Sequence, residues 1–420
     1  MKNIIIFPGK VDSVFFTNEL PYIVKYFDRI RIFTYDGNKS KYLGLQKKYN
    51  VEIYRVKFSL LYFLKKKFIG WLVEPDTKIE FKRAYKNKKK FQAILYVIYY
   101  GLFYLSVEEN IRSIISKMGT SDEIYLYSFW LSRGAYVIAN LNLCRDNRVR
   151  LVVSRAHGYD LYEARNKTGY LPFREYLDRN LDKIYFISSQ GREYFLSQNY
   201  CDSLPSSKKE ISRLGSFNDR KLKKIIKVDK KSICIASCSS IIQVKRIDII
   251  IRILSAINLP IIWVHIGDGN KKNEMVKLAR NMLGKKENIN FDFLGNINNC
   301  DILDTYIKLD VDYLINMSDS EGIPVTFMEA LSIGIPVIAR NVGGIEEIIH
   351  DNNGLIIKDI NIVDIKIIED FLNIRLKNPN IYKALSDECI NEYEMNYSGS
   401  KNYDNFFHQL SLTHYKHASN

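Results

Sequence analysis

Two glutamates stand eight positions apart in the segment from Ser318 to Ile349, in surroundings that suit a phosphorylated polyol. Glu321 lies in a polar loop, and Glu329 lies in a helix that we expect to begin near Pro324. Backbone N–H groups at the start of a helix form a site for an anion such as a diphosphate. Because carboxylates accept hydrogen bonds from hydroxyl groups, the glutamates can hold the polyol while the amides hold its phosphate.

Positive charge for the same chemistry is available upstream, at Lys245 and Arg246. When a diphosphate leaves, negative charge builds on it, and fixed cations stabilise that charge. The alternative is an ordinary solvated Lys-Arg pair. The helix dipole disfavours cations at a helix start unless an anion is present, which favours the first interpretation.

Glycine-containing turns follow two expected strands, at Gly267 in the run from His265 to Gly269 and at Gly295 in the run from Phe293 to Asn296. Ligands of open α/β sheets bind beyond the carboxyl ends of the strands, so these turns are well placed. Taken alone, they could equally be simple turns.

The first half offers a histidine in a polar loop, within the run Arg155 to Tyr162. His157 follows an expected strand and is flanked by arginine, glycine and aspartate. A single histidine is often structural, but this loop context favours a function for His157, and Asp160 could contact a ligand.

Short β-branched runs alternate with helical patterns in the second half, which is typical of a parallel sheet wrapped by helices. We therefore predict an α/β, doubly wound fold. The expected strands are Ser232–Ala236, Ile261–Ile266, Ile289–Leu294, Tyr313–Asn316 and Pro336–Ala339, and the expected helices are Arg246–Ala256, Asn273–Leu283, Asp301–Lys308 and Thr326–Ile333.

The first half follows the same pattern less regularly. No Walker pattern or Gly-x-Gly-x-x-Gly follows its first strand. A chain of 420 residues favours two domains, which we place at 1–215 and 216–392, with the boundary in the basic run from Ser216 to Lys231. The expected strands are Asn3–Phe7, Ile30–Thr34, Glu123–Tyr127, Arg150–Val153 and Lys183–Phe186.

The net charge of +15 comes from the first half alone. Residues 1–215 hold 37 Lys and Arg against 21 Asp and Glu, whereas residues 216–420 hold 25 against 26. This excess suggests an anionic partner, such as a membrane surface or a phosphate-bearing molecule, with plain solubility as the alternative.

Two aromatic segments of the first half invite comparison with a membrane. Phe58–Trp71 mixes large apolar residues with three lysines, as an interfacial helix does. Phe91–Val107 has 17 consecutive uncharged residues, which is short for a span and rich in tyrosine. We favour a buried helix for the latter, with a peripheral membrane contact as the alternative.

The six cysteines are scattered and form no Cys-x-x-Cys pair, which favours a reducing compartment. The first apolar run is too short for a secretory signal. We expect a cytoplasmic protein, with association with the inner face of the membrane as the accompanying expectation.

The motif pieces of the second half together resemble glycosyltransferase family 4, whose members have the two-Rossmann GT-B architecture. A single piece would be weak, but several match in order and spacing. These are Glu321-Gly322-Ile323-Pro324, Glu329-Ala330, Gly334-x-Pro336 and Gly343-Gly344-x-Glu346.

This resemblance implies a retaining sugar transfer in a cleft between two domains, with the donor on the second domain. Glu321 would face the sugar hydroxyls, and Glu329 would hold the ribose. Gly322, Ile323, Pro324 and Val325 would lie close to the sugar and the diphosphate. A C-terminal segment from about 393 to 420 would pack back on the first domain.

The resemblance also implies a basic pair for the leaving diphosphate. Lys245 matches its lysine, whereas Ser240 occupies the position of its arginine and Arg246 is the substitute we expect. His157 matches a histidine-bearing loop opposite the donor. Gly267 and Gly295 resemble the nucleotide-side loops.

A metal site is considered at Asp310-Val311-Asp312, which looks like the Asp-x-Asp of the metal-dependent GT-A transferases. It directly precedes a strand and lacks an accompanying His or Glu cluster, so we expect no bound metal and no cofactor beyond the co-substrate.

The expected partners are a UDP- or GDP-linked sugar and a glycan acceptor, which we expect to be lipid-linked and destined for a bacterial surface polysaccharide, with no nucleic acid. The alternatives are a nucleotide-sugar epimerase of the same fold and a non-catalytic sugar-nucleotide-binding or membrane scaffold protein.

Overall fold

Isoleucine-rich runs form the central strands of two parallel sheets. In the computed structural model, Ile4, Ile5 and Ile6 of β1 (Lys2–Gly9) are fully buried, and five of the six residues of β8 (Ile233–Cys238) are buried. Strands covered by helices on both faces lose the alternation of apolar and polar residues, which explains these continuous runs. The structure describes residues 1–11, 13–35, 39–56, 66–142, 146–198, 205, 208–358 and 362–413.

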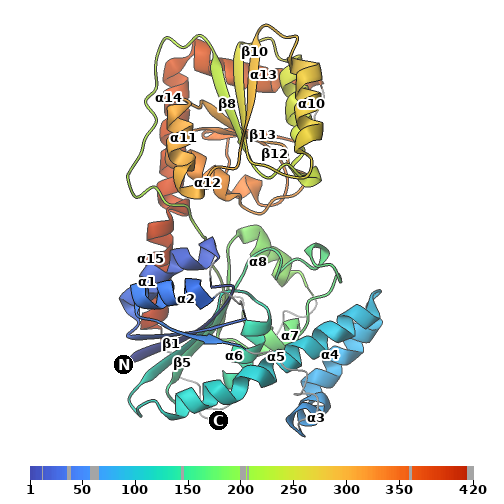
Figure 1. Cartoon of the computed structure of the whole chain (residues 1–420), viewed down its shortest axis with the longest axis vertical. Helices are drawn as coiled ribbons and strands as arrows, with labels where there is room; N and C mark the ends of the chain where they lie inside the picture. Colours follow the sequence, from blue (N-terminus) through green and yellow to red (C-terminus); the bar gives the residue numbers. More distant parts are fainter. Residues whose placement is uncertain are drawn as a thin grey trace. The chain divides into compact units, whose positions relative to one another are not determined.

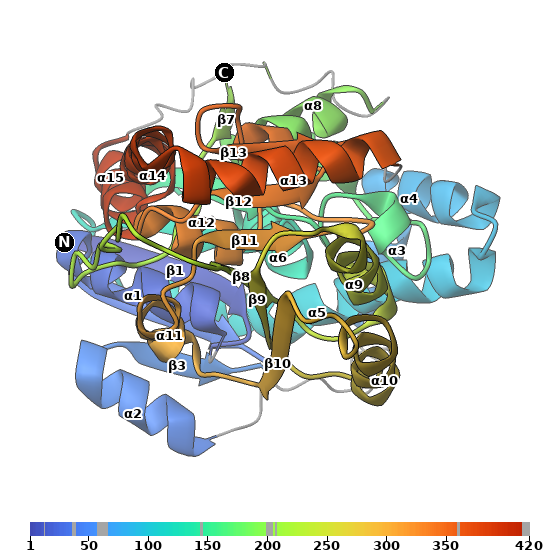
Figure 2. The same cartoon turned by 90° about the horizontal axis from the view of Figure 1, so that it is seen from above.

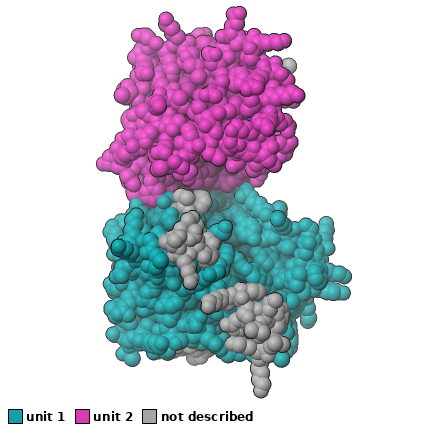
Figure 3. All heavy atoms as spheres, viewed as in Figure 1, with its two compact units in different colours: residues 1–212, 403–420 teal, residues 213–402 magenta. Residues whose placement is uncertain are grey.

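The chain divides into two compact units, coloured separately in Figure 3. Unit 1 comprises residues 1–212 and 403–420, and unit 2 comprises residues 213–402. The sequence interpretation placed the boundary at 215/216 and began the returning segment at about 393. The structure instead assigns the C-terminal residues to unit 1 from Tyr403 onward.

Unit 1 is built on a seven-stranded, all-parallel sheet with the order β3-β2-β1-β4-β5-β6-β7. All five predicted strands are present, and the two that prediction missed, β3 and β7, are short strands at the sheet edges. The remaining bounds are β2 (Arg29–Thr34), β3 (Glu52–Arg55), β4 (Glu123–Ser128), β5 (Val149–Ala156), β6 (Lys183–Phe186) and β7 (Lys209–Ile211).

Helices cover both faces of this sheet (Figures 1 and 2). The first begins where the Ser13 side chain accepts a hydrogen bond from the Phe16 N–H at 3.3 Å, a common N-cap. The helices are α1 (Val14–Tyr26), α2 (Lys39–Tyr49), α3 (Lys66–Val73), α4 (Pro75–Lys86), α5 (Lys90–Ser116), α6 (Arg133–Asn142), η2 (Glu163–Arg165), α7 (Arg174–Asn180) and α8 (Ser189–Leu196).

Helix α5 contains the apolar segment Phe91–Val107. It is, among the described helices, the one long and apolar enough to cross a membrane by length and composition, and 56% of its apolar window is buried inside the protein. Trp71 of α3 packs on it so closely that a β-carbon at Gly101 would lie 2.4 Å from the indole ring. The helix is therefore part of the core of unit 1. Residues 58–65 of the predicted interfacial segment Phe58–Trp71 lie outside the described residues.

The C-terminal helix completes the core of unit 1. Its apolar residues Phe406 and Phe407 pack against Tyr127 of the sheet, with ring centroids 5.7 Å and 5.9 Å apart. Asp404 accepts hydrogen bonds from Lys25 and Tyr26 at 2.7 Å and 2.9 Å. These contacts explain why the last helix belongs to the first unit.

Unit 2 is built on a six-stranded parallel sheet with the order β10-β9-β8-β11-β12-β13. Its five predicted strands and four predicted helices are all present, and the short edge strand β13 was missed. The strands are β9 (Ile261–Ile266), β10 (Ile289–Gly295), β11 (Tyr313–Asn316), β12 (Val337–Arg340) and β13 (Gly354–Ile357). The helices are η4 (Gln243–Lys245), α9 (Ile247–Ala256), α10 (Lys272–Leu283), η5 (Asn299–Asp301), α11 (Ile302–Lys308), α12 (Val325–Ser332), η6 (Ile345–Glu347), α13 (Ile362–Lys377), α14 (Pro379–Glu392) and η7 (Tyr393–Tyr397). The last helix, α15 (Gly399–Leu412), begins in unit 2 and belongs to unit 1 from Tyr403 onward.

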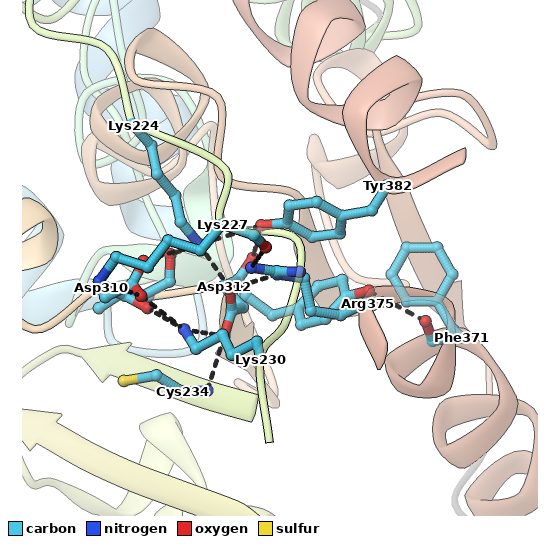
Figure 4. Close-up of polar contacts among 11 residues, drawn as sticks. Lys224, Lys227, Lys230, Cys234, Asp310, Asp312, Phe371, Arg375 and Tyr382 are labelled. Atoms are coloured by element: carbon cyan, nitrogen blue, oxygen red, sulfur yellow. Dashed lines mark hydrogen bonds and ion pairs between the residues drawn. The ribbon is translucent and has the colours of Figure 1, made fainter. Parts of the chain in front are cut away.

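A buried cluster of ion pairs connects the segment before β8 to the sheet of unit 2 (Figure 4). Asp312 is fully buried, and its carboxylate lies 2.6 Å from Lys224, 2.5 Å from Lys230 and 2.7 Å from Arg375. Burial raises the pKa of Asp312, but the two lysines outweigh that effect and hold the pKa below its usual value. The Asp-x-Asp sequence therefore has a structural role in this unit.

Candidate active site

Lys245 and Glu321 form an ion pair at the carboxyl edge of the unit 2 sheet, with 2.7 Å between Nζ and Oε1. Lys245 follows β8 and Glu321 follows β11, and these two strands are neighbours in the sheet. Both side chains are partly exposed, and Asn316 donates a second hydrogen bond to the same Glu321 oxygen at 3.2 Å. Two of the predicted catalytic residues, 76 positions apart, are thus brought together.

The Glu321 loop rests on the backbone of the Gly343-Gly344 turn. Gly343 has φ +59°, and a β-carbon there would lie 2.0 Å from the Glu321 carbonyl oxygen. At Gly344 a β-carbon would lie 3.2 Å from the Gly322 carbonyl oxygen. The paired glycines of the motif therefore serve the close approach of two loops, which fixes where Glu321 stands.

Helix α12 presents its first turn beside Glu321. The space around Gly322 is open, since a β-carbon there would meet no atom within 4 Å. The first N–H groups of a helix have no acceptor within the helix and are available to an anion. Pro324 precedes α12 and carries no N–H, so Gly322, Ile323 and Val325 provide the amides of the predicted set.

Glu329 lies in the second turn of α12 and is half-buried. Burial raises the pKa of its carboxyl to about 7. Within the part of the chain that the structure describes, no cation pairs with this carboxylate. A ligand hydroxyl that donates a hydrogen bond to Glu329 would favour its ionised form.

The second predicted cation, Arg246, is engaged by carboxylates. It has a left-handed backbone conformation (φ +48°) at the start of α9 and lies 3.1 Å from both Asp248 and Asp319. Ser240, at the position of the missing arginine, is exposed. Arg340 at the end of β12 also contacts Asp319, at 2.5 Å. Sequence reasoning missed Arg340, although a basic residue at the carboxyl end of a predicted strand was the available signal.

The two predicted glycine turns of unit 2 lie side by side. The Gly267 N–H donates a hydrogen bond to the Gly295 carbonyl at 2.8 Å. A β-carbon at Gly267 (φ +136°) would lie 2.0 Å from the Ser239 carbonyl oxygen. Gly267 therefore allows the turn after β9 to approach the loop that carries Ser240.

A chain of hydrogen bonds orients His265 toward that same loop. Trp263 Nε1 donates to the Ser237 hydroxyl at 3.0 Å, which lies 2.8 Å from His265 Nδ1, while Nε2 lies 3.2 Å from the Ser239 carbonyl. The carbonyl can only accept, so Nε2 carries the proton and Nδ1 accepts from Ser237. Burial lowers the pKa of His265 to about 4, which keeps the ring neutral.

In unit 1, His157 lies against two aromatic rings, with centroids 4.6 Å from Phe129 and 4.5 Å from Trp130. It is 7% exposed, and burial lowers its pKa, so the ring is neutral near pH 7. Neither ring nitrogen has a hydrogen-bond partner among the described residues. The nearest Asp160 oxygen is 3.8 Å from Nδ1, beyond hydrogen-bond distance.

Asp160 differs from the expectation that it faces a ligand. It is 1% exposed, and its two oxygens accept hydrogen bonds from the backbone N–H groups of Leu131 and His157, at 2.7 Å and 2.8 Å. A carboxylate occupied in this way holds its loop in place. Asp160 is therefore a positioning residue for the His157 loop.

Among the residues that the structure describes, no group of three or more His, Cys, Asp or Glu side chains lies close enough to hold a metal ion.

Solved structures with two parallel α/β units of this kind define the fold class. The chain superposes on HepE from Anabaena, determined with UDP and glucose, with a TM-score of 0.63 over 97% of this chain and 99% of HepE, at 13% identity. It superposes on the lipopolysaccharide outer core galactosyltransferase WaaB with a TM-score of 0.65 over 98% and 99%, at 14% identity. The fold is GT-B, as predicted from the motif resemblance.

Sequence comparison finds a family match within unit 2. Residues 218–387 match the family described as glycosyl transferases group 1. The Escherichia coli O-antigen biosynthesis glycosyltransferase WbnH is 30% identical over 211 residues, which cover 46% of this chain and 57% of WbnH. The match thus spans little more than half the length of that relative.

Proposed function

We propose that the chain is a retaining glycosyltransferase that moves a hexose from a UDP- or GDP-sugar to a glycan acceptor. The observation that carries the proposal is the Lys245–Glu321 pair, fixed by Gly343 at the edge of the unit 2 sheet. This pair lies in the segment that matches the group 1 family. UDP and glucose in HepE, and the role of WbnH in O-antigen biosynthesis, support a nucleotide-sugar donor and a bacterial surface polysaccharide.

In the proposed reaction, the amides of Gly322, Ile323 and Val325 and the Lys245 amine bind the donor diphosphate. Glu321 accepts hydrogen bonds from sugar hydroxyls, and Glu329 accepts them from the ribose. The bond between the anomeric carbon and the phosphate oxygen breaks as the acceptor hydroxyl forms its bond to that carbon on the same face. The hydroxyl proton passes to the departing phosphate.

Lys245 and the α12 amides stabilise the charge on this leaving group, which we assign to them rather than to a divalent ion. The family's second cation is supplied by Arg246 or Arg340, because the ion pairs to Asp319 hold both near the same loop. No further cofactor is proposed.

We assign the acceptor to unit 1, which carries the positive charge excess, and propose a lipid-linked oligosaccharide at the inner face of the membrane. The protein would then be cytoplasmic and peripheral. An anionic lipid surface attracts basic, aromatic protein surfaces.

The deciding experiment incubates the protein with labelled UDP- and GDP-sugars and bacterial membranes. Label should enter the lipid fraction, and NMR of the product should show the anomeric configuration of the donor. Label found only in soluble product would remove the lipid-linked acceptor. An inverted product would contradict retention, and an epimerised nucleotide sugar formed without acceptor would contradict transfer altogether.

A further inference from the structure

Unit 1 contains a pocket of about 290 Å³ that the reaction proposed above leaves unexplained. It opens where β1, β2 and β4 end and where α6 begins. Of these elements, β1 and α6 are labelled in Figure 1. Its lining includes Lys10, Tyr35, Trp130, Arg133 and Tyr159. This volume is at the lower end of small-molecule pockets, which suits one sugar residue better than a long glycan.

The charges of the pocket are all positive. Lys10 and Arg133 are its charged lining residues, and no carboxylate lines it. Arg133 has no ion pair among the described residues, and its Nη1 atom is buried without a hydrogen-bond acceptor. Burying a donor without an acceptor costs free energy, and an anion from outside the chain would remove that cost. This guanidinium is therefore suited to bind such an anion.

Aromatic rings hold the guanidinium in place. Its central carbon lies 4.8 Å from the Tyr35 ring centroid, 4.4 Å from that of Tyr99 and 5.3 Å from that of Phe103. These contacts fix a side chain that otherwise has many rotamers, and they leave its N–H groups to form further hydrogen bonds. Arg133 also stands at the first position of α6, whose dipole adds to the attraction for an anion.

The remaining wall is aromatic and partly open to solvent. Tyr35 is 40% exposed and Tyr159 is 57% exposed. Trp130 is fixed by a hydrogen bond from Nε1 to the Pro8 carbonyl at 3.0 Å and by the His157 ring on which it packs. Rigid amphipathic rings such as these can pack against the apolar C–H face of a sugar ring while its hydroxyls remain solvated.

We propose that this pocket binds an anionic sugar residue, with its carboxylate or phosphate on Arg133 and Lys10 and its ring against the aromatic wall. This inference rests on the proposed function, since the residue would belong to the acceptor. The acceptor glycan would then carry a negative charge at or near the site of transfer. The shared chemistry is an anionic oxygen group on a sugar, which a uronic acid or a sugar phosphate can supply.

The test is equilibrium binding to the full-length protein, followed by saturation-transfer NMR and Trp fluorescence. The probes are methyl glucoside, methyl glucuronide and glucose 1-phosphate, each with and without saturating UDP. At least one anionic probe should bind about tenfold or more tightly than the neutral glucoside. Which anionic probe binds better distinguishes a carboxylate from a phosphate.

The variants are Arg133→Gln and Lys10→Gln, with Arg165→Gln as the matched control. Arg165 stacks on Tyr162 at 4.8 Å in the same unit but does not line the pocket. Arg133→Gln should remove the preference for the anion, Lys10→Gln should reduce it, and Arg165→Gln should leave it unchanged. Lys10→Gln keeps the test valid if Arg133→Gln unfolds.

Equal binding of all three probes, or a preference that survives both pocket variants, would overturn the inference. UDP binding is measured in the same samples. Absence of any anion preference in the wild-type protein, with intact UDP binding and transfer, contradicts this inference alone. Absence of UDP binding contradicts the proposed function, whatever the sugar probes do.

Discussion

A β-carbon on Gly343 would lie 2.0 Å from the carbonyl oxygen of Glu321. We expect Gly343→Ala to displace the Glu321 loop and to weaken donor binding about tenfold or more, because the alanine meets both a clash and a positive φ. Isothermal titration with UDP-sugar measures the effect. Gly169→Ala is the control, since Gly169 has a similar φ of +61° with no atom within 4 Å of the added carbon. Equal affinity in wild type and Gly343→Ala would refute this explanation of the paired glycines.

The Lys245–Glu321 pair provides the second prediction. Lys245→Ala should lower the rate of sugar transfer by about 100-fold or more, because fixed charge at a leaving group is worth that much in preorganised sites. Glu321→Gln should also lower transfer. Lys366→Ala is the control, since Lys366 forms an exposed ion pair with Asp370 at 3.0 Å in the same unit. Full transfer activity in both site variants would remove their assigned roles.

The raised pKa of Glu329 predicts a pH dependence of donor binding. A ribose hydroxyl that donates to the carboxylate stabilises the ionised form, so the affinity for UDP should increase as pH rises through about 7. Titration calorimetry between pH 6 and pH 8 measures this change. Glu329→Gln cannot ionise and should bind UDP more weakly, with a flatter pH profile. The same profile in both proteins would exclude Glu329 from the site.

His265 predicts a pH dependence of stability. Its folded-state pKa of about 4 lies below the ordinary value near 6.5, so the unfolded chain binds more protons between these values and stability falls as pH decreases. About 2 kcal/mol of the free energy of unfolding should be lost from this group between pH 7 and pH 5. Urea titrations at the two pH values measure the loss. His265→Gln should show a smaller loss over the same interval.

Two helical glycines of unit 1 should respond in opposite directions. A β-carbon at Gly101 would lie 2.4 Å from the Trp71 ring, so Gly101→Ala should cost about 1–3 kcal/mol through overpacking. At Gly70 the added carbon meets no atom within 4 Å, so Gly70→Ala should stabilise by about 0.5–1 kcal/mol. Denaturant unfolding measures both changes. A neutral Gly101→Ala variant would contradict the observed packing of Trp71.

The central strands could be predicted because each is a run of apolar residues long enough to stand out. The edge strands β3, β7 and β13 could not, since each has at most two buried residues, whereas the equally short β6, β11 and β12 have three. Glu321 and Gly343 could be predicted because they belong to one motif, whose pieces stand at fixed distances from one another along the sequence. The contact between Lys245 and Glu321 depends on the order of β8 and β11 in the sheet, which no local pattern contains.

The burial of Asp160 and the position of Arg133 in a pocket could not be predicted from the sequence either. A loop aspartate looks the same whether it faces a ligand or accepts two backbone N–H groups. The rings around Arg133 come from distant positions, Tyr35, Tyr99 and Phe103, which no spacing rule connects. Tertiary packing decides both cases.

The Asp312 cluster constrains the order in which this domain can evolve. Three cations share one buried carboxylate, so replacing Asp312 first would leave the buried charges of Lys224 and Arg375 without their closest carboxylate. Viable mutational paths must therefore begin with the cations or change several positions together. Substitutions in this cluster of unit 2 should therefore be slow and correlated, even though none of its residues belongs to the candidate active site.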